Sequence, residues 1–322
     1  MTPAASVSRV TLDAQAVADA FGLGRAESLS EPVARGELGQ IRRLVTDRGG
    51  WAVKESLEPF DADDLAAAQT SGEFHTACVD AGVPSPAPQT SAGRYVAEVD
   101  GEQVQAYTWV DLEDPDPLLD PEAVGALVAA LHDVRRPARG AVDAWFEAPI
   151  GQREWRAVLK ASRGAGAPFA DHLAELVPAL VEVESTLTPM SGVQTCHLDL
   201  WADNLRATPT DGLCVFDFDN AGPGDPGREL AMVVFEFGQG DPGRQRRLYD
   251  AYREAGGPGR LTGRTDFALT VAQLHHIGHR HLRMWLAARD SEARARSLAG
   301  IDEFLSRPFL LPDLDSALDA TT

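Results

Sequence analysis

The sequence predicts an α+β fold in two lobes, a small β-rich lobe over residues 1–110 and a larger, mainly helical lobe over residues 111–322. Three observations support this prediction. The chain has 322 residues, more than one hydrophobic core usually serves. Extended segments and hairpin turns concentrate before residue 110, whereas apolar residues at helical spacing dominate afterwards. The acidic, proline-containing segment 111–120 between them is typical of a lobe boundary.

The first region is predicted to combine two hairpins with two helices. Residues 47–50, Asp-Arg-Gly-Gly, are a strong hairpin turn because glycine supplies the positive φ angles that such turns need. The longer helix should start after Asp61 as its cap and end before Gly82 and Pro84. The expected segments are a helix at 12–21, strands at 32–35, 40–46 and 51–55, a helix at 62–81, and strands at 95–99 and 104–110.

The second region is predicted to be helical except for one buried strand. The helix at 121–134 has a proline at its first turn and apolar residues at helical spacing. The apolar run at 213–217 is typical of a buried strand that ends in Asp217. Further helices are expected at about 155–162, 169–187, 228–237, 244–255 and 267–288.

Composition favours a cytoplasmic protein that binds neither nucleic acid nor membrane. No apolar run approaches the roughly 20 residues that a helix needs to cross a bilayer, and the first residues do not resemble a signal peptide. Cys78, Cys196 and Cys214 show no metal-like pairing, as expected of a reduced protein. The formal charge of −20 repels polyanions and would attract a cationic partner. The oligomeric state, monomer or homodimer, stays open.

Residues 197–204, His-Leu-Asp-Leu-Trp-Ala-Asp-Asn, have the spacing of the protein-kinase catalytic loop H-R-D-L-x-x-x-N. Phosphoryl transfer requires a protein to hold the phosphates, neutralise them with Mg²⁺ and orient a hydroxyl for in-line attack. The carboxylate of Asp199 can orient that hydroxyl or accept its proton. The amide oxygen of Asn204 is a hard ligand that suits Mg²⁺, and Asp217 ends the next strand, where the main metal ligand is expected.

Lys54 is the expected contact to the nucleotide phosphates. It ends the stretch Trp-Ala-Val-Lys at 51–54, which is close to the V-A-I-K strand of kinases. A lysine on the buried face of a strand is costly without a partner, and Glu73 on the following helix is the expected one. The backbone of residues 107–110, beginning at Tyr107, should offer hydrogen bonds to an adenine ring. Trp109 is expected to pack or to contact that ring.

Each of these features also has an ordinary structural explanation. Residues 197–204 could be a polar loop, and Lys54 with Glu73 could be a surface pair, since charged residues usually face water. The kinase hypothesis is favoured because all the elements occur in one order along the chain. Asp225 is expected to cap the next helix. Histidines 275, 276, 279 and 281 could bind zinc, but no acidic catalytic motif accompanies them, which favours a wall of the substrate cleft.

The ordered set resembles the aminoglycoside phosphotransferase family of the protein-kinase-like superfamily, over about residues 25–290. The resemblance implies a kinase-like fold with ATP between the lobes. It also implies that Asp199 is catalytic, that His197 braces the catalytic loop, and that Asn204 and Asp217 hold Mg²⁺. The residues that carry the resemblance are Ala52-Val53-Lys54, Glu73, Gly82-Val83-Pro84, Leu127, Leu131, His132, His197-x-Asp199, Asn204, Asp217-x-Asp219 and the segment 221–226. The expected nucleotide contacts are Lys54, Glu73, Gly36, Gly39, Tyr107 and Trp109.

The chain departs from the kinase pattern in ways that bear on its substrate. The first hairpin carries no G-x-G-x-x-G, and only Gly36 and Gly39 punctuate it. Glu229 stands where an aspartate often follows the Gly-Asp-Pro segment. Trp201 replaces the loop lysine of protein kinases, Asp-Phe-Asp at 217–219 replaces Asp-Phe-Gly, and no A-P-E follows. These last departures argue against a protein substrate.

The sequence therefore predicts an ATP- and Mg²⁺-dependent O-phosphotransferase that transfers the γ-phosphoryl group to a hydroxyl of a small molecule. The favoured acceptor is an antibiotic, aminoglycoside-like or another natural product and cationic in keeping with the acidic charge, with resistance or self-protection as the outcome. The alternatives are a choline- or homoserine-type metabolite kinase, a protein kinase, and a non-catalytic nucleotide-binding regulator. A regulator usually lacks the lysine, the aspartate or a metal ligand, and this chain has them all.

Overall fold

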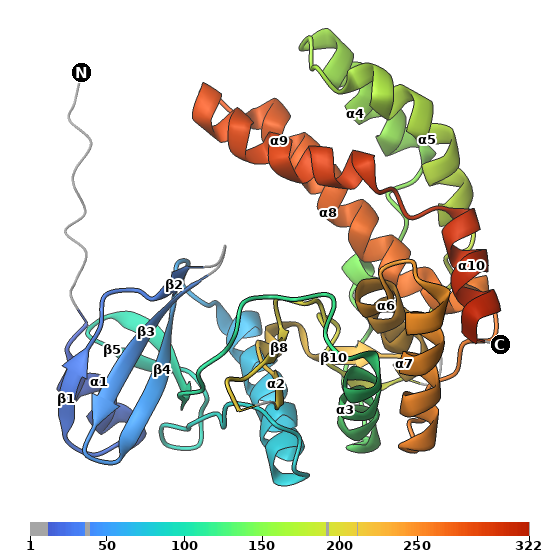
Figure 1. The fold of residues 1–322 in the computed structure, drawn as a ribbon. Helices are drawn as coiled ribbons and strands as arrows, with labels where there is room; N and C mark the ends of the chain where they lie inside the picture. The colour runs from blue at the N-terminus through green and yellow to red at the C-terminus, as the bar shows by residue number, and fades with distance from the viewer. Residues whose placement is uncertain (1–11, 36–38, 191–192, 211, 322) are drawn as a thin grey trace, which may run out of the picture. The chain divides into compact units, whose positions relative to one another are not determined.

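The computed structural model of the chain describes residues 12–35, 39–190, 193–210 and 212–321. Backbone contacts divide the chain into two compact units, the first made of residues up to 113 together with 208–220, the second of 114–207 and 221–322. The first unit contains a curled antiparallel sheet with helices, and the second is mainly helical (Figure 1). The predicted α+β class is therefore confirmed.

The sheet of the first unit has the strand order β1-β3-β4-β6-β5, and β2 pairs with β3 at one edge. Residues that face each other in an antiparallel pair lie on the same side of the sheet. Arg42 faces Val53 and Ile41 faces Lys54, so Lys54 lies on the side opposite Val53. The strands of this unit are β1 (Ala26–Leu29), β2 (Ala34–Arg35), β3 (Gly39–Thr46), β4 (Gly49–Ser56), β5 (Ala97–Val99), β6 (Glu102–Thr108) and β9 (Leu213–Val215).

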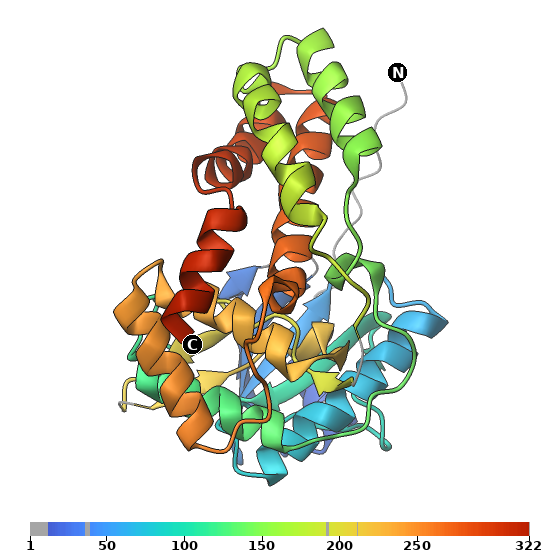
Figure 2. The same ribbon diagram turned by 90° about the vertical axis from the view of Figure 1, so that its right-hand side faces the viewer.

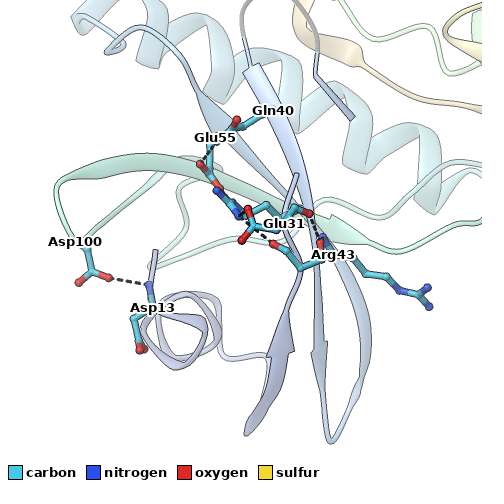
Figure 3. A network of polar contacts seen from close by, with 8 residues as sticks. Asp13, Glu31, Gln40, Arg43, Glu55 and Asp100 are labelled. Atoms are coloured by element: carbon cyan, nitrogen blue, oxygen red, sulfur yellow. Dashed lines mark hydrogen bonds and ion pairs between the residues drawn. The ribbon is translucent and has the colours of Figure 1, made fainter. Parts of the chain in front are cut away.

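Helix α1 (Ala14–Phe21) covers the Val53 side of this sheet. Asp13 caps the helix by accepting from the N–H of Ala16, and its own N–H donates to Asp100 Oδ2 at 3.1 Å (Figure 3). The apolar face of the helix packs against strand residues to form one core cluster. The buried members of this cluster are Leu12, Val17, Ala18, Phe21, Leu23, Leu44, Val53, Ala97, Val99, Val104 and Ala106.

A largely buried polar cluster lies next to this core, on the same side of the sheet, where β3 pairs with β4. Glu55 accepts from Gln40 Nε2 at 2.6 Å and from Arg42 Nε, and Arg42 also donates to the carbonyl of Ser30 at 3.0 Å (Figure 3). The charges of Arg42 and Glu55 are buried but paired, which avoids the cost of an isolated buried charge. This cluster ties β1, β3 and β4 together at their ends.

Helix α2 (Ala62–Asp80) begins at the predicted cap, because Asp61 and Asp64 form a reciprocal capping box. In its middle, a Cβ on Gly72 would lie 2.4 Å from the ring of Tyr95, so only glycine allows this close approach. The helix packs against the 3₁₀ helix η2 (Phe218–Asn220). This contact brings the segment after β9 next to the helix that carries Glu73.

The second unit is built on long helices with short strands between them (Figure 2). Strands β7 and β10 pair in an antiparallel ladder. Helices α4, α5, α8 and α9 bury a shared core that includes Trp155, Leu173 and Leu282. The elements are α3 (Pro121–Asp133), η1 (Ala144–Phe146), α4 (Gln152–Gly164), α5 (Ala170–Glu184), β7 (Gln194–Cys196), β8 (Leu205–Ala207), β10 (Gly222–Gly224), α6 (Pro226–Gly238), α7 (Pro242–Glu254), η3 (Arg264–Phe267), α8 (Ala268–Ala287), α9 (Ser291–Ser306) and α10 (Leu311–Thr321).

The predicted long helices are present, with ends that differ from the prediction by less than one turn. Asp225 caps α6 as predicted, by accepting from the N–H groups of Gly227 and Arg228. Helices α9 and α10 and the short strands β1, β7, β8 and β10 were not predicted, because three- or four-residue strands carry too little periodicity and α9 is rich in charge. Within the described residues, every helix is too short or too polar to cross a bilayer.

Candidate active site

The side chain of Lys54 lies beside two carboxylates of the first unit. Its ammonium group donates to Asp217 Oδ1 at 2.8 Å and to Asp219 Oδ2 at 2.6 Å. Burial alone lowers the pKa of Lys54, but the charges of Asp219 and Asp217 outweigh burial and raise it above the ordinary value of 10.5. Lys54 therefore stays protonated at physiological pH, and its largely buried charge is compensated by two acidic partners.

The aromatic ring between the two aspartates anchors them to helix α2. Phe218 is buried and stacks on the ring of His75, with centroids 3.9 Å apart and planes 10° from parallel. The ring of Phe74 meets the ring of Phe218 edge-on, with centroids 5.9 Å apart. Asp217 has a φ of 59°, in the left-handed region that residues other than glycine rarely adopt. We infer that the packing of Phe218 offsets the cost of this turn, which lets Asp217 and Asp219 reach one ammonium group.

Glu73, the predicted partner of Lys54, lies on α2 and accepts a long hydrogen bond from Gln69 at 3.5 Å. Its ion pair with Lys54 stays a prediction. The sequence does not predict Asp217 and Asp219 as the ion-pair partners of Lys54, because they follow it by 163 and 165 positions. Local spacing patterns carry no information about pairs so distant in the chain.

Two backbone N–H groups at the end of β6 already have partners within the first unit. The N–H of Thr108 donates to the carbonyl of Ala87 at 2.9 Å, and the N–H of Trp109 donates to that of Gly50 at 3.0 Å. A base would therefore have to use other backbone groups of residues 107–110. The contact of this segment with an adenine ring stays a prediction.

The side chains of Trp109 and Tyr107 pack within the first unit. The guanidinium of Arg43 lies 4.7 Å from the centre of the Trp109 ring, and the indole N–H donates to Asp111 at 2.7 Å. Tyr107 stacks with His75 at 5.8 Å. Burial, together with the charge of Asp219, raises the pKa of Tyr107 above its ordinary value of 10.0, so the phenol stays neutral. These contacts make both rings part of the wall on the Lys54 side of the sheet.

Of the two predicted loop glycines, Gly39 starts strand β3 and Gly36 lies outside the described residues. A Cβ on Gly39 would lie 2.9 Å from the carbonyl oxygen of Glu55, closer than real Cβ contacts come. Glycine at this position therefore allows β3 and β4 to approach beside Lys54. Its contact with a nucleotide stays a prediction.

In the second unit, Asp199 and Asn204 lie on the loop between β7 and β8. The amide nitrogen of Asn204 donates to Asp199 Oδ2 at 2.9 Å and to the Asp199 carbonyl at 3.0 Å. The N–H of Asn204 donates in turn to the carbonyl of Trp201 at 2.9 Å, which closes the loop. Asp199 is half-buried between Leu198 and Leu200, both of them buried. The loop therefore holds the Asp199 carboxylate in one orientation, and its catalytic role stays a prediction.

A buried hydrogen-bonded chain, which we call the loop brace, holds the residue before Asp199. Glu229, at the start of α6, accepts from the N–H of Leu198 and from His132 Nε2 at 2.7 Å. His132 Nδ1 lies 2.8 Å from the hydroxyl of Tyr252, which accepts from the N–H of Gly259 at 2.7 Å. The Tyr252 proton therefore points to His132, and His132 donates to Glu229. Burial by itself raises the pKa of Glu229, but its interactions with His132, His197 and the N–H of Leu198 together outweigh burial and lower it.

Bracing of the catalytic loop is the role that the resemblance implies for His197. The side chain of His197 is buried, and its interaction with Glu229 is one of those that lower the pKa of Glu229. Its bracing role stays a prediction, whereas the hydrogen bonds of Glu229 with Leu198 and with His132 are visible in the structure. Glu229 is a departure from the family pattern, and His132 is part of the resemblance. The signal for Glu229 was its position at the start of the helix that Asp225 caps.

The histidines of helix α8 make separate contacts and do not converge on one point. His275 pairs with the buried Glu184 at 2.8 Å, His276 contacts the carbonyl of Ala148 at 3.0 Å, and His279 pairs with Glu154 at 3.4 Å. Glu184 also accepts from the N–H of Gly151 and the indole of Trp155. Among the described residues these histidines form no cluster of metal-ligating atoms. His276 additionally stacks on the ring of Trp145, with centroids 5.0 Å apart.

One buried group of metal-ligand types does exist in the described part of the chain, made of His132, Cys196 and Glu229, whose ligand atoms lie within 4.8 Å of one another. Two of its members are already hydrogen-bonded to each other in the loop brace. Burial and the charge of Glu229 raise the pKa of the Cys196 thiol well above 9.0, which disfavours the thiolate that a metal would need. This group is therefore a structural cluster.

Comparison with known proteins decides the family. The profile of the APH family, described as a phosphotransferase enzyme family, matches residues 31–264. The chain belongs to this family. The predicted resemblance is thereby confirmed, and the protein is a phosphotransferase. Comparison with curated protein sequences gives no match for this APH phosphotransferase.

Solved structures show that this APH phosphotransferase has a protein-kinase-like fold, as predicted. Spectinomycin phosphotransferase in complex with ADP and spectinomycin is 12% identical, with a TM-score of 0.67 over 97% of this chain and 99% of that one. An aminoglycoside phosphotransferase from Alicyclobacillus acidocaldarius is 15% identical, with a TM-score of 0.64 over 98% and 97%. A choline kinase from Streptococcus pneumoniae is 12% identical, with a TM-score of 0.53 over 88% and 96%.

Proposed function

We propose that this APH phosphotransferase transfers the γ-phosphoryl group of ATP to a hydroxyl of an antibiotic or related natural product, and so inactivates it. The observation that carries this proposal is the pair formed by Asp199 and Asn204. The Asn204 amide fixes one oxygen of the Asp199 carboxylate at 2.9 Å. A carboxylate held in this way is preorganised to orient a hydroxyl or accept its proton, and positioning supplies most of the rate in phosphoryl transfer.

Magnesium binding at Asn204 and Asp217 is part of the same proposal. The Asn204 amide nitrogen points to Asp199, so its oxygen is the atom left to act as a ligand. Asp217 keeps 40% of its side chain exposed, which leaves its carboxylate accessible to a cation. Both are hard oxygen donors of the kind that Mg²⁺ prefers. When bound, Mg²⁺ neutralises the charge of the nucleotide phosphates.

Lys54 is the proposed contact to the α- and β-phosphates. Its ammonium group stays protonated and is held at a defined position by Asp217 and Asp219. Nucleotide use is further supported by the crystal structures of spectinomycin phosphotransferase with ADP and with AMP. Glu73, Gly39, Tyr107 and Trp109 keep their proposed places around the nucleotide.

A cationic acceptor is supported by the charge of the protein. The formal charge of −20 raises the local concentration of cations and steers them during encounter. Spectinomycin, the ligand of one structural relative, is an antibiotic. A metabolite kinase acting on a quaternary ammonium alcohol such as choline is the second candidate. The half-buried indole of Trp145 favours it, because an aromatic face binds such cations. The exposed Asp143, two residues earlier, accepts from the backbone N–H of Trp145.

The test is a mass-spectrometric search for phosphate addition to a panel of aminoglycosides, spectinomycin, macrolides, nucleoside antibiotics, choline and homoserine, each with ATP and Mg²⁺. Asp199→Asn and Asp217→Ala should each lower turnover at least about 10²-fold, because they remove the oriented carboxylate and a metal ligand. Asp203→Asn is the matched control, since Asp203 is an exposed aspartate of the same loop and should keep normal turnover.

Circular dichroism should show all three variants folded. Near-normal turnover of Asp199→Asn would overturn the proposed role of the loop. ATP binding without transfer to any compound, and without ATP hydrolysis, would instead support the regulator alternative. Phosphorylation of choline but of none of the antibiotics would support the second candidate.

A further inference from the structure

The residue that precedes Asp199 has a strained backbone. Leu198 has a φ of 64° and is 1% exposed. A left-handed conformation of this kind is unfavourable for a non-glycine residue, and it persists only where the surroundings determine it from several sides. The contacts of the two peptide groups of Leu198 therefore show what sets the direction of the chain as it enters Asp199.

Each of these two peptide groups is held by a different helix. The N–H of Leu198 donates to Glu229 at the start of α6, within the loop brace. Its carbonyl accepts from Gln273 Nε2 of helix α8 at 2.7 Å. Because a peptide unit is planar, an anchored Leu198 oxygen also sets the plane that contains the nitrogen and Cα of Asp199. Gln273 thereby acts on the atom from which the Asp199 side chain leaves the backbone.

The buried surroundings of Gln273 indicate that its hydrogen bond to the Leu198 carbonyl is its main interaction. Its side chain is 2% exposed, and its amide oxygen accepts no hydrogen bond from the residues that the structure describes. A buried amide with an unmet acceptor is destabilising, and an apolar side chain of equal volume would not carry this cost. Gln273 therefore contributes little net stability. Methionine has a similar volume, but it lacks the amide N–H that Gln273 donates to the Leu198 carbonyl.

The helix that carries Gln273 also contacts the segment that precedes α4. One turn further along α8, His276 stacks on Trp145 of η1 and contacts the Ala148 carbonyl at 3.0 Å. One turn earlier, Leu269 packs in a cluster with Leu198. Helix α8 thus contacts both the half-buried ring of Trp145 and the backbone of the catalytic loop, and it links them through one rigid element.

We propose that Gln273 is a positioning residue that orients Asp199 through the Leu198 carbonyl and couples it to helix α8. This inference rests on the proposed function, in which Asp199 orients the acceptor hydroxyl. A displacement of the order of 1 Å at the reacting groups can lower the rate about 10²-fold while leaving binding intact. Loss of the Gln273 donor should therefore lower kcat and leave nucleotide affinity unchanged.

The experiment compares Gln273→Met and Gln273→Leu with Gln245→Met. Gln245 is a suitable control because it is also a buried glutamine of the second unit, 4% exposed and with an amide oxygen that lacks a hydrogen-bond donor among the described residues. Turnover is measured as transfer to the acceptor found in the panel and as ATP hydrolysis with water as acceptor. ADP binding is measured by calorimetry, and amide hydrogen exchange is followed in the peptide that spans residues 196–205.

We expect both Gln273 variants to lose at least tenfold in kcat, with KM for ATP and ADP affinity within about twofold of the wild type. The amide hydrogens of residues 198–200 should exchange at least tenfold faster in these variants, and at the wild-type rate in Gln245→Met. Wild-type kcat and wild-type exchange in Gln273→Met would overturn the inference. So would equal losses in the Gln245 control. Asp199→Asn, measured in parallel, separates the two proposals, since its normal turnover would refute the proposed function itself.

Discussion

Replacing Glu229 with alanine should destabilise the second unit and slow catalysis together. The carboxylate is fully buried and accepts from the N–H of Leu198 and from His132. Each donor that loses its buried acceptor costs about 1–3 kcal/mol, because it stays buried and unsatisfied. Two groups lose their acceptor here, and a cavity is added, so we expect a loss of about 4 kcal/mol in the free energy of unfolding.

A second variant separates the charge of Glu229 from its shape. Glu229→Gln keeps an oxygen that can accept from Leu198, but its amide must donate to His132, whose Nδ1 already faces the hydroxyl of Tyr252. One hydrogen bond of the loop brace is then mismatched, and the expected loss is about 1–2 kcal/mol. The exposed Glu254 of α7 provides the control, and Glu254→Ala should change stability by less than about 0.5 kcal/mol.

Urea unfolding followed by circular dichroism measures these differences, and the rate of phosphate transfer reports on the loop. The reasoning predicts the order wild type, Glu229→Gln, Glu229→Ala for both stability and turnover. A loss below about 1 kcal/mol in Glu229→Ala would show that the brace is dispensable. Equal losses in the two variants would show that the charge of Glu229, and not the cavity, sets the cost.

Two further predictions concern acid stability and thiol reactivity. The pKa of Glu184 and that of Glu229 lie below the ordinary 4.5, because hydrogen bonds outweigh burial, which alone would raise them. The two carboxylates contribute their full stabilisation above pH 4.5, and this contribution is lost as the pH falls through their lowered pKa values in the folded protein. The melting temperature should therefore fall steeply in that acid range. The fall should be smaller in Glu184→Gln. Cys78, Cys196 and Cys214 are buried, and burial raises the pKa of Cys214 to about 11. An aromatic disulfide reagent should therefore label all three only after denaturation, and one fast-reacting thiol in the native protein would contradict this.

Much of the fold could be predicted from the sequence because its signals are local. The caps Asp61 and Asp225 lie next to the helices they start, and the hairpin at 47–50 turns over Asp47 and Arg48, between the paired Thr46 and Gly49. The pair of Asp199 and Asn204 is equally local, since one loop holds both residues. Helices α9 and α10 escaped prediction because their apolar stripes are weak and depend on packing against α8 and α7.

The order of Lys54, the loop at 197–204 and Asp217 was sufficient, from the sequence alone, to determine the family and the chemistry to expect of each side chain. Only the tertiary structure decided which distant groups hold these side chains in place: two aspartates for Lys54, Glu229 and Gln273 for the strained Leu198. The physical reason is chain separation. Spacing rules describe residues within a turn or a hairpin, whereas the partners of a buried polar group are chosen by packing among elements far apart in the chain.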